Sequence, residues 1–464
     1  MTHLTRRALL FASGAATLAA AGAQLQAAAS PTFDLRARRT SFDFGGGPTH
    51  GLASLADAAP PPVIRLKQGQ PAHLRLTNGL DEYSTMHWHG IRLPNAMDGV
   101  PYLTQFPIAP GDNFDYRFTP PDAGTYWYHP HCRTMAKMAQ GLTGALIVEE
   151  ADDPGFDADI ALNLKDFRLA ADHSLLPHFT PRGAARGGTL GNVTTINWQV
   201  MPVLDVPAGA LVRLRFVVTD VTRIFKLALP SEASGRIIAW DGQPIEEPIG
   251  WPTSDAPLWM GPGQRVDIVL RTPDTEGAEI PLINMIGRTP HQIGTLRTTG
   301  PSLARDLRDL RPLPRNPYAV PNMAEAEKQV HELVFGWTPE GNGANNGFCG
   351  TYEYTFWSIN RAPWPGDAQG PSTPLATLDR GKSYLLRLRN ESPNLHPIHL
   401  HGLLFKPVRS SLRPVLANYT DTYLLMKNEV VDVALVADNP GDWALHCHVI
   451  EHQKTGLSGF IRVT

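Results

Sequence analysis

Histidines are the residues in this sequence whose spacing points to chemistry. The chain contains 17 of them, and random placement of that many would give only about 0.6 His-x-His pairs. Four such pairs are present, and two further histidines, His396 and His452, lie close to the last two pairs. In a β-strand, residues i and i+2 point to the same side, so each pair would present two imidazoles side by side to a metal ion. The pairs are His87/His89, His129/His131, His399/His401 and His446/His448.

Cys447 indicates which metal these histidines would bind. It lies between His446 and His448, so on a strand its sulfur would point away from their imidazoles. With His396 and His452 it can form a His₂Cys trigonal site, the ligand set of blue copper. The four pairs would then hold a second, multinuclear copper centre on the other side of the strand, on the order of 10–15 Å away. Zinc is the alternative, but zinc takes four ligands, or three and a water, and this set is larger.

The other histidines are isolated in the sequence. We expect them at the surface or hydrogen-bonded in the core. They are His3, His50, His73, His173, His178, His291 and His331.

Short strands are the elements that would position these residues. Several segments alternate apolar and polar residues between turns rich in Gly, Pro, Asn and Asp, as strands do. They are 60–80, 209–220, 262–272, 381–392 and 428–449. A related strand recurs near residues 75, 215 and 389, which predicts three domains of about 145 residues, the size of a β-sandwich. The sequence therefore predicts an all-β protein with domains at 30–153, 154–305 and 320–464 and a short linker helix at 303–310.

Composition excludes several other classes of protein. The chain has 42% hydrophobic and 18% charged residues, as expected of a large soluble globular protein. Its 41 glycines and 42 prolines argue against a helical bundle, and its three cysteines are too few for a disulfide scaffold. A net charge of −3 argues against nucleic acid or an anionic membrane as the main partner.

Residues 1–29 have the organisation of an export signal. A cationic start without acids (1–7) precedes an Ala/Leu-rich run and small residues suited to cleavage near Ala29. The Arg6–Arg7 pair resembles a twin-arginine signal, which would make the twin-arginine export machinery a partner. An uncleaved anchor is the alternative, but the apolar run is shorter than the ~20 residues of a spanning helix. We expect a periplasmic or secreted protein with no stable membrane anchor.

The histidine motifs resemble the copper-binding motifs of three-domain multicopper oxidases of the laccase type. They are HWHG (87–90), YHPH (128–131), HPIHLHG (396–402) and HCHVIEHQKTGL (446–457), in the family's order. The resemblance implies three consecutive cupredoxin-like Greek-key domains, four copper ions and a trinuclear centre between domains 1 and 3. It assigns His396, Cys447 and His452 to the type-1 copper, and His87 and His399 to the type-2 copper. It assigns the type-3 pair to His89, His129, His131, His401, His446 and His448.

The resemblance also implies the reaction. A small-molecule substrate is oxidised in four one-electron steps, the electrons pass through Cys447 and its flanking histidines, and O₂ is reduced to water. Asp98 stands where the family has a proton-donating carboxylate; the alternative is a turn-forming Asp in the Asp98–Gly99 pair. Glu451 is expected to support its neighbour His452 or to be solvated, without a direct role.

Phenols and aromatic amines are the substrates that we expect. Relatives that oxidise Cu(I) carry a Met-rich insert in the third domain, whereas the matching region here, 341–375, contains no methionine. Met135 and Met138 are expected in the core. Oxidation of Cu(I) in copper tolerance is the alternative, and a non-catalytic exported copper-binding or scaffold protein is a further one. We expect a monomer that reacts with its reducing substrate and O₂.

Three more residues complete the expectations. Leu457, ten residues after Cys447, falls at the family's axial position, where many bacterial relatives have methionine. Leucine cannot donate to copper, so we expect a high type-1 potential. Cys132 and Cys349 are not ligands in this assignment. A bridge between them could form in an oxidising periplasm, but a protein folded before export would first meet reducing conditions, so we expect free thiols.

Overall fold

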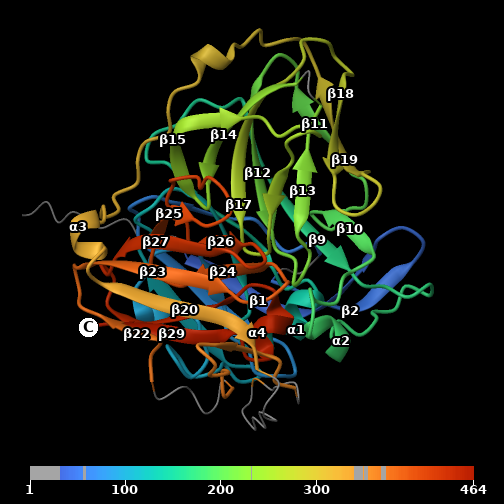
Figure 1. The fold of residues 1–464 in the computed structure, drawn as a ribbon. Helices are drawn as coiled ribbons and strands as arrows, with labels where there is room; N and C mark the ends of the chain where they lie inside the picture. The colour runs from blue at the N-terminus through green and yellow to red at the C-terminus, as the bar shows by residue number, and fades with distance from the viewer. Residues whose placement is uncertain (1–31, 56–58, 231–232, 339–348, 350–353, 367–372) are drawn as a thin grey trace, which may run out of the picture.

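The computed structural model describes residues 32–55, 59–230, 233–338, 349, 354–366 and 373–464, and in this part the chain is almost entirely β (Figure 1). The predicted all-β class is confirmed. The segment read as an export signal lies outside the described residues. Six sheets are present among the described residues, two from each third of the chain.

The first domain consists of two four-stranded sheets. One has the strand order β2-β1-β4-β6 and the other β3-β8-β7-β5. The strands are β1 (Thr32–Asp43), β2 (Pro48–Ser54), β3 (Ile64–Lys67), β4 (Ala72–Asn78), β5 (His87–His89), β6 (Asn113–Phe118), β7 (Gly124–His129) and β8 (Gly144–Glu149).

The second domain consists of a six-stranded and a five-stranded sheet. Their strand orders are β10-β9-β12-β17-β14-β15 and β11-β19-β18-β13-β16. The strands are β9 (Ala158–Phe167), β10 (Val193–Ile196), β11 (Val203–Pro207), β12 (Leu211–Val218), β13 (Phe225–Ala228), β14 (Ser234–Trp240), β15 (Gln243–Gly250), β16 (Leu258–Met260), β17 (Arg265–Arg271), β18 (Glu279–Asn284) and β19 (His291–Thr299).

The third domain consists of two five-stranded sheets. Their strand orders are β21-β20-β23-β27-β25 and β22-β29-β28-β24-β26. The strands are β20 (Val330–Trp337), β21 (Trp357–Ile359), β22 (Ala376–Leu378), β23 (Ser383–Asn390), β24 (His396–Leu400), β25 (Phe405–Ser410), β26 (Thr422–Leu425), β27 (Val430–Val436), β28 (Gly441–Cys447) and β29 (Ser458–Val463).

The three domains share one pairing pattern. In each, the first strand of one sheet runs parallel to a middle strand that is antiparallel to a later one: β1–β4–β6, β9–β12–β17 and β20–β23–β27. The recurring segments near residues 75, 215 and 389 are these middle strands, β4, β12 and β23. The weak sequence repeat therefore marks equivalent places in three related sandwiches.

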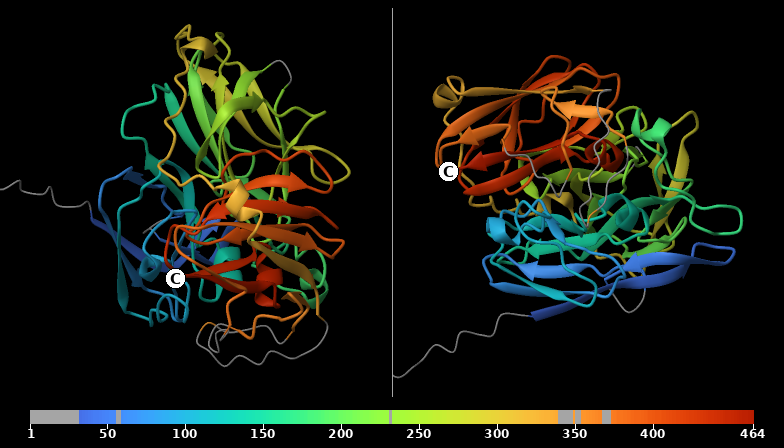
Figure 2. Two further views of the ribbon diagram at one scale, coloured as in Figure 1. Left: turned by 60° about the vertical axis from the view of Figure 1, so that its left-hand side comes forward. Right: turned by 90° about the horizontal axis from the view of Figure 1, so that it is seen from below.

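The apolar core explains how the first and third domains meet. One buried cluster fills the second domain, whereas another is continuous across the first and third domains. Figure 2 shows these two domains, blue and orange to red, lying one against the other with the second domain adjoining both. Strands β5, β7 and β24 are buried along their whole length, which places the His-x-His motifs in the interior.

The helices are short. They are α1 (Thr134–Ala139), α2 (Pro181–Ala184), α3 (Met323–Ala326), α4 (Ile450–Lys454) and the 3₁₀ turns η1 (Asn95–Met97) and η2 (Leu307–Asp309). The helix predicted over 303–310 is wrong in extent. Only η2 forms, because Asp306 caps it at one end and Pro312 and Pro314 prevent its continuation. No helix in the described ranges has the length and apolar character needed to cross a membrane.

Candidate metal centre

Strand pairing brings the four His-x-His motifs together. In the first domain β5 is antiparallel to β7, with His87 opposite His129. In the third domain β24 is antiparallel to β28, with His399 opposite His446. These four histidines are at most 1% exposed. Contacts between the imidazoles of the two strand pairs place them at the interface of the first and third domains.

Ring stacking joins the histidines of the two domains. His87 and His401 stack with 3.8 Å between ring centroids, and His89 and His399 with 3.7 Å. Each stack pairs a first-domain residue with a third-domain residue. The side chains whose potential ligand atoms lie within 4.8 Å of one another include His87/His89/His129, His87/His399/His401 and His131/His401/His446.

A second group forms on the other side of β28. Cys447 Sγ lies 3.5 Å from Nδ1 of His396 and 3.5 Å from Nδ1 of His452, and the two Nδ1 atoms are 3.1 Å apart. All three side chains are 0% exposed. The second nitrogens point away, with His396 Nε2 beside the Ser392 hydroxyl and His452 Nε2 donating to the Arg186 carbonyl. Alternation along β28 thus gives Cys447 to this group and its two neighbours to the larger one.

Unpartnered nitrogens show that the larger group suits metal ions. A buried nitrogen without a partner is costly, and native proteins avoid it. Within the described part of the chain, several of these histidines use one nitrogen in a hydrogen bond and leave the other buried without a partner. The unpartnered atoms include Nε2 of His87, His129 and His399, Nδ1 of His89 and His131, and both nitrogens of His448. Neutral imidazole nitrogens and a thiolate are the donors that copper prefers, so the residues fit copper.

Burial sets the protonation of these groups. It lowers the pKa of His452 to about 4 and that of His401 to about 3, so both imidazoles are neutral near pH 7. Burial also raises the pKa of the Cys447 thiol. A buried thiolate therefore needs a cation beside it, which a metal bound with His396 and His452 would provide.

Comparisons with known proteins agree with this geometry. Residues 36–153 and 345–464 match two family models, each described as multicopper oxidase. The crystal structure of a multi-copper oxidase from Pseudomonas thermotolerans is 38% identical, has a TM-score of 0.83, and the match covers 94% of this chain and 99% of that one. Multicopper oxidase MmcO of Mycobacterium tuberculosis is 27% identical over 96% of this chain and 91% of its own. Laccase-1 of Cryptococcus neoformans is 27% identical over 87% of this chain and 76% of its own.

The chain belongs to the multicopper oxidase family. Multicopper oxidases are copper-dependent oxidoreductases that take electrons from small molecules and use O₂ as the acceptor. This activity argues against the alternative of a non-catalytic scaffold. The expected cupredoxin-like architecture is confirmed by the shared fold.

Asp98 contacts two histidines of the larger group. It follows η1, is 1% exposed, and lies with Oδ2 3.0 Å from His401 Nδ1 and Oδ1 3.2 Å from His87 Nδ1. Burial alone would raise the pKa of Asp98, but the two imidazoles hold it well below its usual range. A role limited to the Asp98–Gly99 turn does not account for these contacts.

Glu451 is buried, so the alternative of a solvated side chain is wrong. Its carboxylate accepts hydrogen bonds from the backbone and hydroxyl of Thr189, the latter at 2.7 Å. These bonds hold the segment 180–189 of the second domain, which contains α2, over the helix α4. Arg186 of this segment accepts the hydrogen bond from His452, and Ala184 accepts one from the indole of Trp357.

Leu457 is buried next to the Cys447 group. It is 0% exposed and belongs to the same apolar cluster as Cys447, and its carbonyl accepts a hydrogen bond from the Cys447 backbone N–H at 3.1 Å. Its side chain is therefore part of the dry surroundings of this site. Met135 and Met138 also lie in buried apolar packing, as expected.

Sequence reasoning gave no role at the histidine centre to Asp421, directly before β26, or to Thr422, its first residue. Asp421 Oδ1 lies 3.2 Å from His89 Nε2, and the Asp421 carbonyl lies 3.0 Å from His399 Nδ1. The Thr422 hydroxyl lies 3.2 Å from His89 Nε2 and 3.1 Å from His399 Nδ1. Neither residue is part of a histidine motif, and only the pairing of β26 with β24 brings them to the centre.

The structure corrects the expectation of free thiols. Cys132 and Cys349 form a disulfide that joins the first and third domains across 217 residues of sequence. Cys447 is the free cysteine. Cys132 directly follows His131, so the bridge lies next to the larger histidine group.

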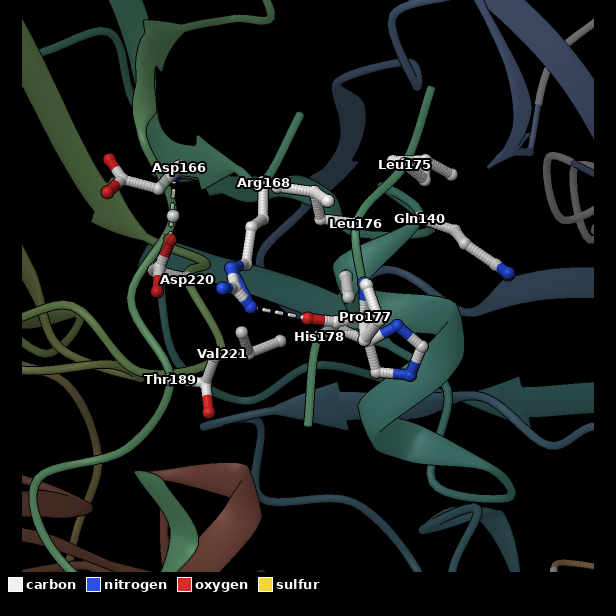
Figure 3. Close-up of a pocket in the computed structure, with 12 residues that line it drawn as sticks. Gln140, Asp166, Arg168, Leu175, Leu176, Pro177, His178, Thr189, Asp220 and Val221 are labelled. Atoms are coloured by element: carbon white, nitrogen blue, oxygen red, sulfur yellow. Dashed lines mark hydrogen bonds between the residues drawn. The ribbon is translucent and has the colours of Figure 1, made fainter. Parts of the chain in front are cut away.

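A pocket of about 330 Å³ lies beside the 180–189 segment (Figure 3). Thr189 and His178 line it together with Asp166, Arg168 and Asp220, and Arg168 donates to the Pro177 carbonyl. No candidate copper ligand is among the described residues that line the pocket. His178 is one of the isolated histidines, and burial lowers its pKa.

Proposed function

We propose that this multicopper oxidase is a three-domain enzyme of the laccase type. It couples four one-electron oxidations of phenols or aromatic amines to the reduction of O₂ to water. The observation that carries the proposal is the convergence of ten histidines and Cys447 into two groups on opposite faces of β28. The similarity to laccase-1 of Cryptococcus neoformans supports the substrate class.

The proposed ligand assignment follows the two groups. His396, Cys447 and His452 would hold the type-1 copper, and His87 and His399 the type-2 copper. The type-3 pair would be held by His89, His129, His131, His401, His446 and His448. Four bound copper ions would supply one-electron oxidation of the donor and four-electron reduction of O₂.

The protein's own residues would connect and protonate these sites. Cys447 belongs to one group while its chain neighbours His446 and His448 belong to the other, so the backbone at the end of β28 offers a covalent electron path. Asp98, whose carboxylate oxygens lie 3.0 Å from His401 Nδ1 and 3.2 Å from His87 Nδ1, would relay protons to the centre. Leu457 and Trp357 would exclude water from the Cys447 group; Trp357 has its ring centroid 4.6 Å from that of His452.

Oxidation of Cu(I) is the second candidate. It is disfavoured because 341–375, about half of which lies outside the described residues, contains no methionine. The methionines next to the first two motifs, Met86, Met135 and Met138, are buried in apolar packing. Thioether sulfur is the ligand that Cu(I) would seek at a docking site.

The substrate class is tested by oxygen uptake of the copper-loaded protein with a substituted phenol and with Cu(I) under the same conditions. We expect the phenol to be oxidised with the higher kcat/KM. A blue visible band from the Cys447 thiolate on copper should accompany activity. A colourless copper-loaded protein would contradict the laccase assignment, and preferential Cu(I) turnover would select the second candidate.

We also propose domain boundaries, an export route and an oligomeric state for the protein. Residues 1–29 would be a twin-arginine-like export signal, and 30–153, 154–305 and 320–464 the three domains. The mature protein would be a periplasmic or secreted monomer. Mass spectrometry of the exported protein would give the cleavage site, and light scattering its oligomeric state.

A further inference from the structure

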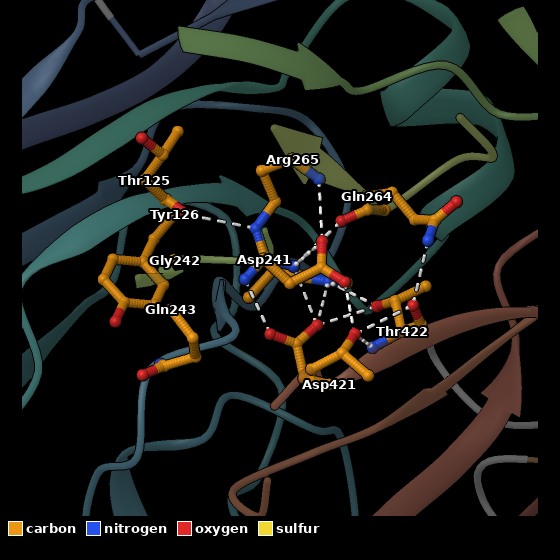
Figure 4. Close-up of polar contacts among 12 residues, drawn as sticks. Thr125, Tyr126, Asp241, Gly242, Gln243, Gln264, Arg265, Asp421 and Thr422 are labelled. Atoms are coloured by element: carbon orange, nitrogen blue, oxygen red, sulfur yellow. Dashed lines mark hydrogen bonds and ion pairs between the residues drawn. The ribbon is translucent and has the colours of Figure 1, made fainter. Parts of the chain in front are cut away.

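Arg265 lies where the three domains meet. It is the first residue of β17 in the second domain and is 0% exposed. Its guanidinium donates from Nη1 and Nη2 to the two oxygens of Asp421 in the third domain, at 2.7 and 2.6 Å. Its Nε donates to the carbonyl of Thr125 in the first domain at 3.1 Å. One side chain of the second domain thus binds both domains that carry the candidate copper ligands (Figure 4).

The partner of Arg265 contacts a histidine from each of those domains. Asp421 Oδ1, which accepts from Arg265, lies 3.2 Å from His89 Nε2 and 3.3 Å from His399 Nδ1. The opposite nitrogens of these two imidazoles, His89 Nδ1 and His399 Nε2, are buried without partners. Asp421 therefore sits behind both rings and fixes the direction in which their free nitrogens point.

Space for this pair is built into the first domain. Gly90, directly after His89, has a φ of +89°, and a side-chain carbon there would lie 2.4 Å from Arg265 Nη2 and 2.7 Å from Asp421 Oδ2. The glycine of the HWHG motif thus leaves room for the ion pair beside His89. A side-chain carbon at Gly263 of the second domain, whose carbonyl accepts from Arg265, would lie 3.1 Å from His89 and 3.1 Å from His448.

The chemistry of the contact makes it a rigid one. A guanidinium and a carboxylate in a two-point contact restrict each other's rotation, which a single hydrogen bond does not. Both groups are buried, so separating them would leave an uncompensated charge. Asp241 accepts from the Arg265 backbone N–H at 2.8 Å, and its carboxylate lies 3.3 Å from Nη1, which holds the arginine from behind.

We propose that Arg265 is a positioning residue of the trinuclear centre: through Asp421 it sets the orientation of His89 and His399. The second domain contributes none of the proposed ligands, yet it would control the geometry of the centre between the other two. The inference rests on the proposed assignment of His89 and His399 to that centre.

The test compares Arg265→Lys with a matched control, Arg213→Lys. Arg213 is also buried in the second domain and paired with carboxylates, Asp267 at 2.7 Å and Glu150 at 2.6 Å, but these partners contact no proposed ligand. Copper content, the visible band of the thiolate-bound copper and the electron paramagnetic resonance of the type-2 copper are measured for each. Arg265→Lys should lower copper affinity of the trinuclear centre on the order of 10–100-fold and alter the type-2 signal, while the visible band stays.

The control separates positioning from general stability. Arg213→Lys should leave the copper content and both spectra as in the wild type, whatever it costs in stability. Asp421→Asn, which keeps the side-chain size, should reproduce the spectral change of Arg265→Lys, and the double variant should be no worse because both residues act in one contact.

Each outcome decides the question. A folded Arg265→Lys protein with wild-type copper content and type-2 signal overturns the inference. The inference is also overturned if Arg265→Lys and Asp421→Asn both fail to fold while Arg213→Lys folds. The ion pair would then be needed for folding and not specifically for positioning the histidines. A wild-type protein that is blue but shows no type-2 or type-3 copper contradicts the proposed function instead.

Discussion

Cys447 belongs to one histidine group and its two chain neighbours belong to the other. Its replacement therefore gives the sharpest test at the residue scale. A serine hydroxyl does not ionise near neutral pH and is a poor copper ligand. Cys447→Ser should therefore abolish the visible band and the turnover. The histidine pairs should still bind copper, and the fold should be retained. Visible absorption, oxygen uptake and circular dichroism measure the three effects. Appreciable phenol oxidation by this variant would refute the electron route.

Asp98 is predicted to act on protons, not on electrons. Asp98→Asn keeps the side-chain size but removes the charge that faces His87 and His401. If the carboxylate relays protons, turnover should fall on the order of 10²-fold, a typical contribution of acid–base catalysis, while anaerobic reduction of the type-1 copper by substrate stays fast. Stopped-flow reduction and steady-state oxygen uptake across pH separate the two steps. Unchanged steady-state rates at every pH would leave Asp98 a structural role only.

Leu457 is predicted to influence the redox potential of the type-1 copper. A methionine thioether would donate weakly to the copper and stabilise its oxidised state, which leucine cannot do. Leu457→Met should therefore lower the type-1 potential, and the swap should cost under ~1.5 kcal/mol of stability because its volume is conserved. Redox titration of the visible band in both proteins is the measurement. An equal or higher potential in the variant would show that position 457 is not axial.

At the scale of elements, the segment 180–189 contacts the outer nitrogen of His452, and we predict that it limits the access of electron donors to this imidazole. Its backbone carbonyl at Arg186 accepts from His452, and Thr189 fastens the segment to Glu451 on α4. Thr189→Val removes the hydroxyl bond, at a cost of about 1.5–3 kcal/mol for a hydrogen bond to a charged group. A loosened segment should let bulky phenols reduce the type-1 copper faster.

The comparison for this prediction is another buried threonine of the second domain. Thr195 is 0% exposed and donates to the Lys165 carbonyl, away from α4. Thr195→Val should lower stability to denaturant without changing the reduction rate by bulky phenols. If both variants reduce at the wild-type rate, the segment does not limit access to His452.

At the scale of the whole molecule, the local patterns were predictable and the contacts between domains were not. His-x-His spacing on strands identifies which imidazoles share a face, and Cys447 between two histidines identifies the opposite face, because alternation along a strand is a local property. Asp421 and Arg265 carry no such pattern. They become neighbours of His89 only after three domains pack, so no spacing in the chain reveals them.

The disulfide is the clearest case in which whole-molecule packing overrode an expectation drawn from the export route. Cys132 and Cys349 lie 217 residues apart, in domains that meet around the histidines. Closing so long a loop restricts the unfolded chain, and such bridges typically stabilise by about 2–4 kcal/mol. Cys132→Ser with Cys349→Ser should therefore lower stability to denaturant by about that amount.

Thiol counting decides whether the bridge is present in the exported protein. Denatured, copper-free protein should titrate as one free thiol, Cys447, without reductant, and as three after reduction. Three thiols without reductant would show that folding ahead of export leaves the cysteines unpaired. Because the bridge ties the first domain to the third directly beside His131, the double serine variant should also bind copper less tightly at the histidines shared by these domains than at the Cys447 group, whose three residues all belong to the third domain.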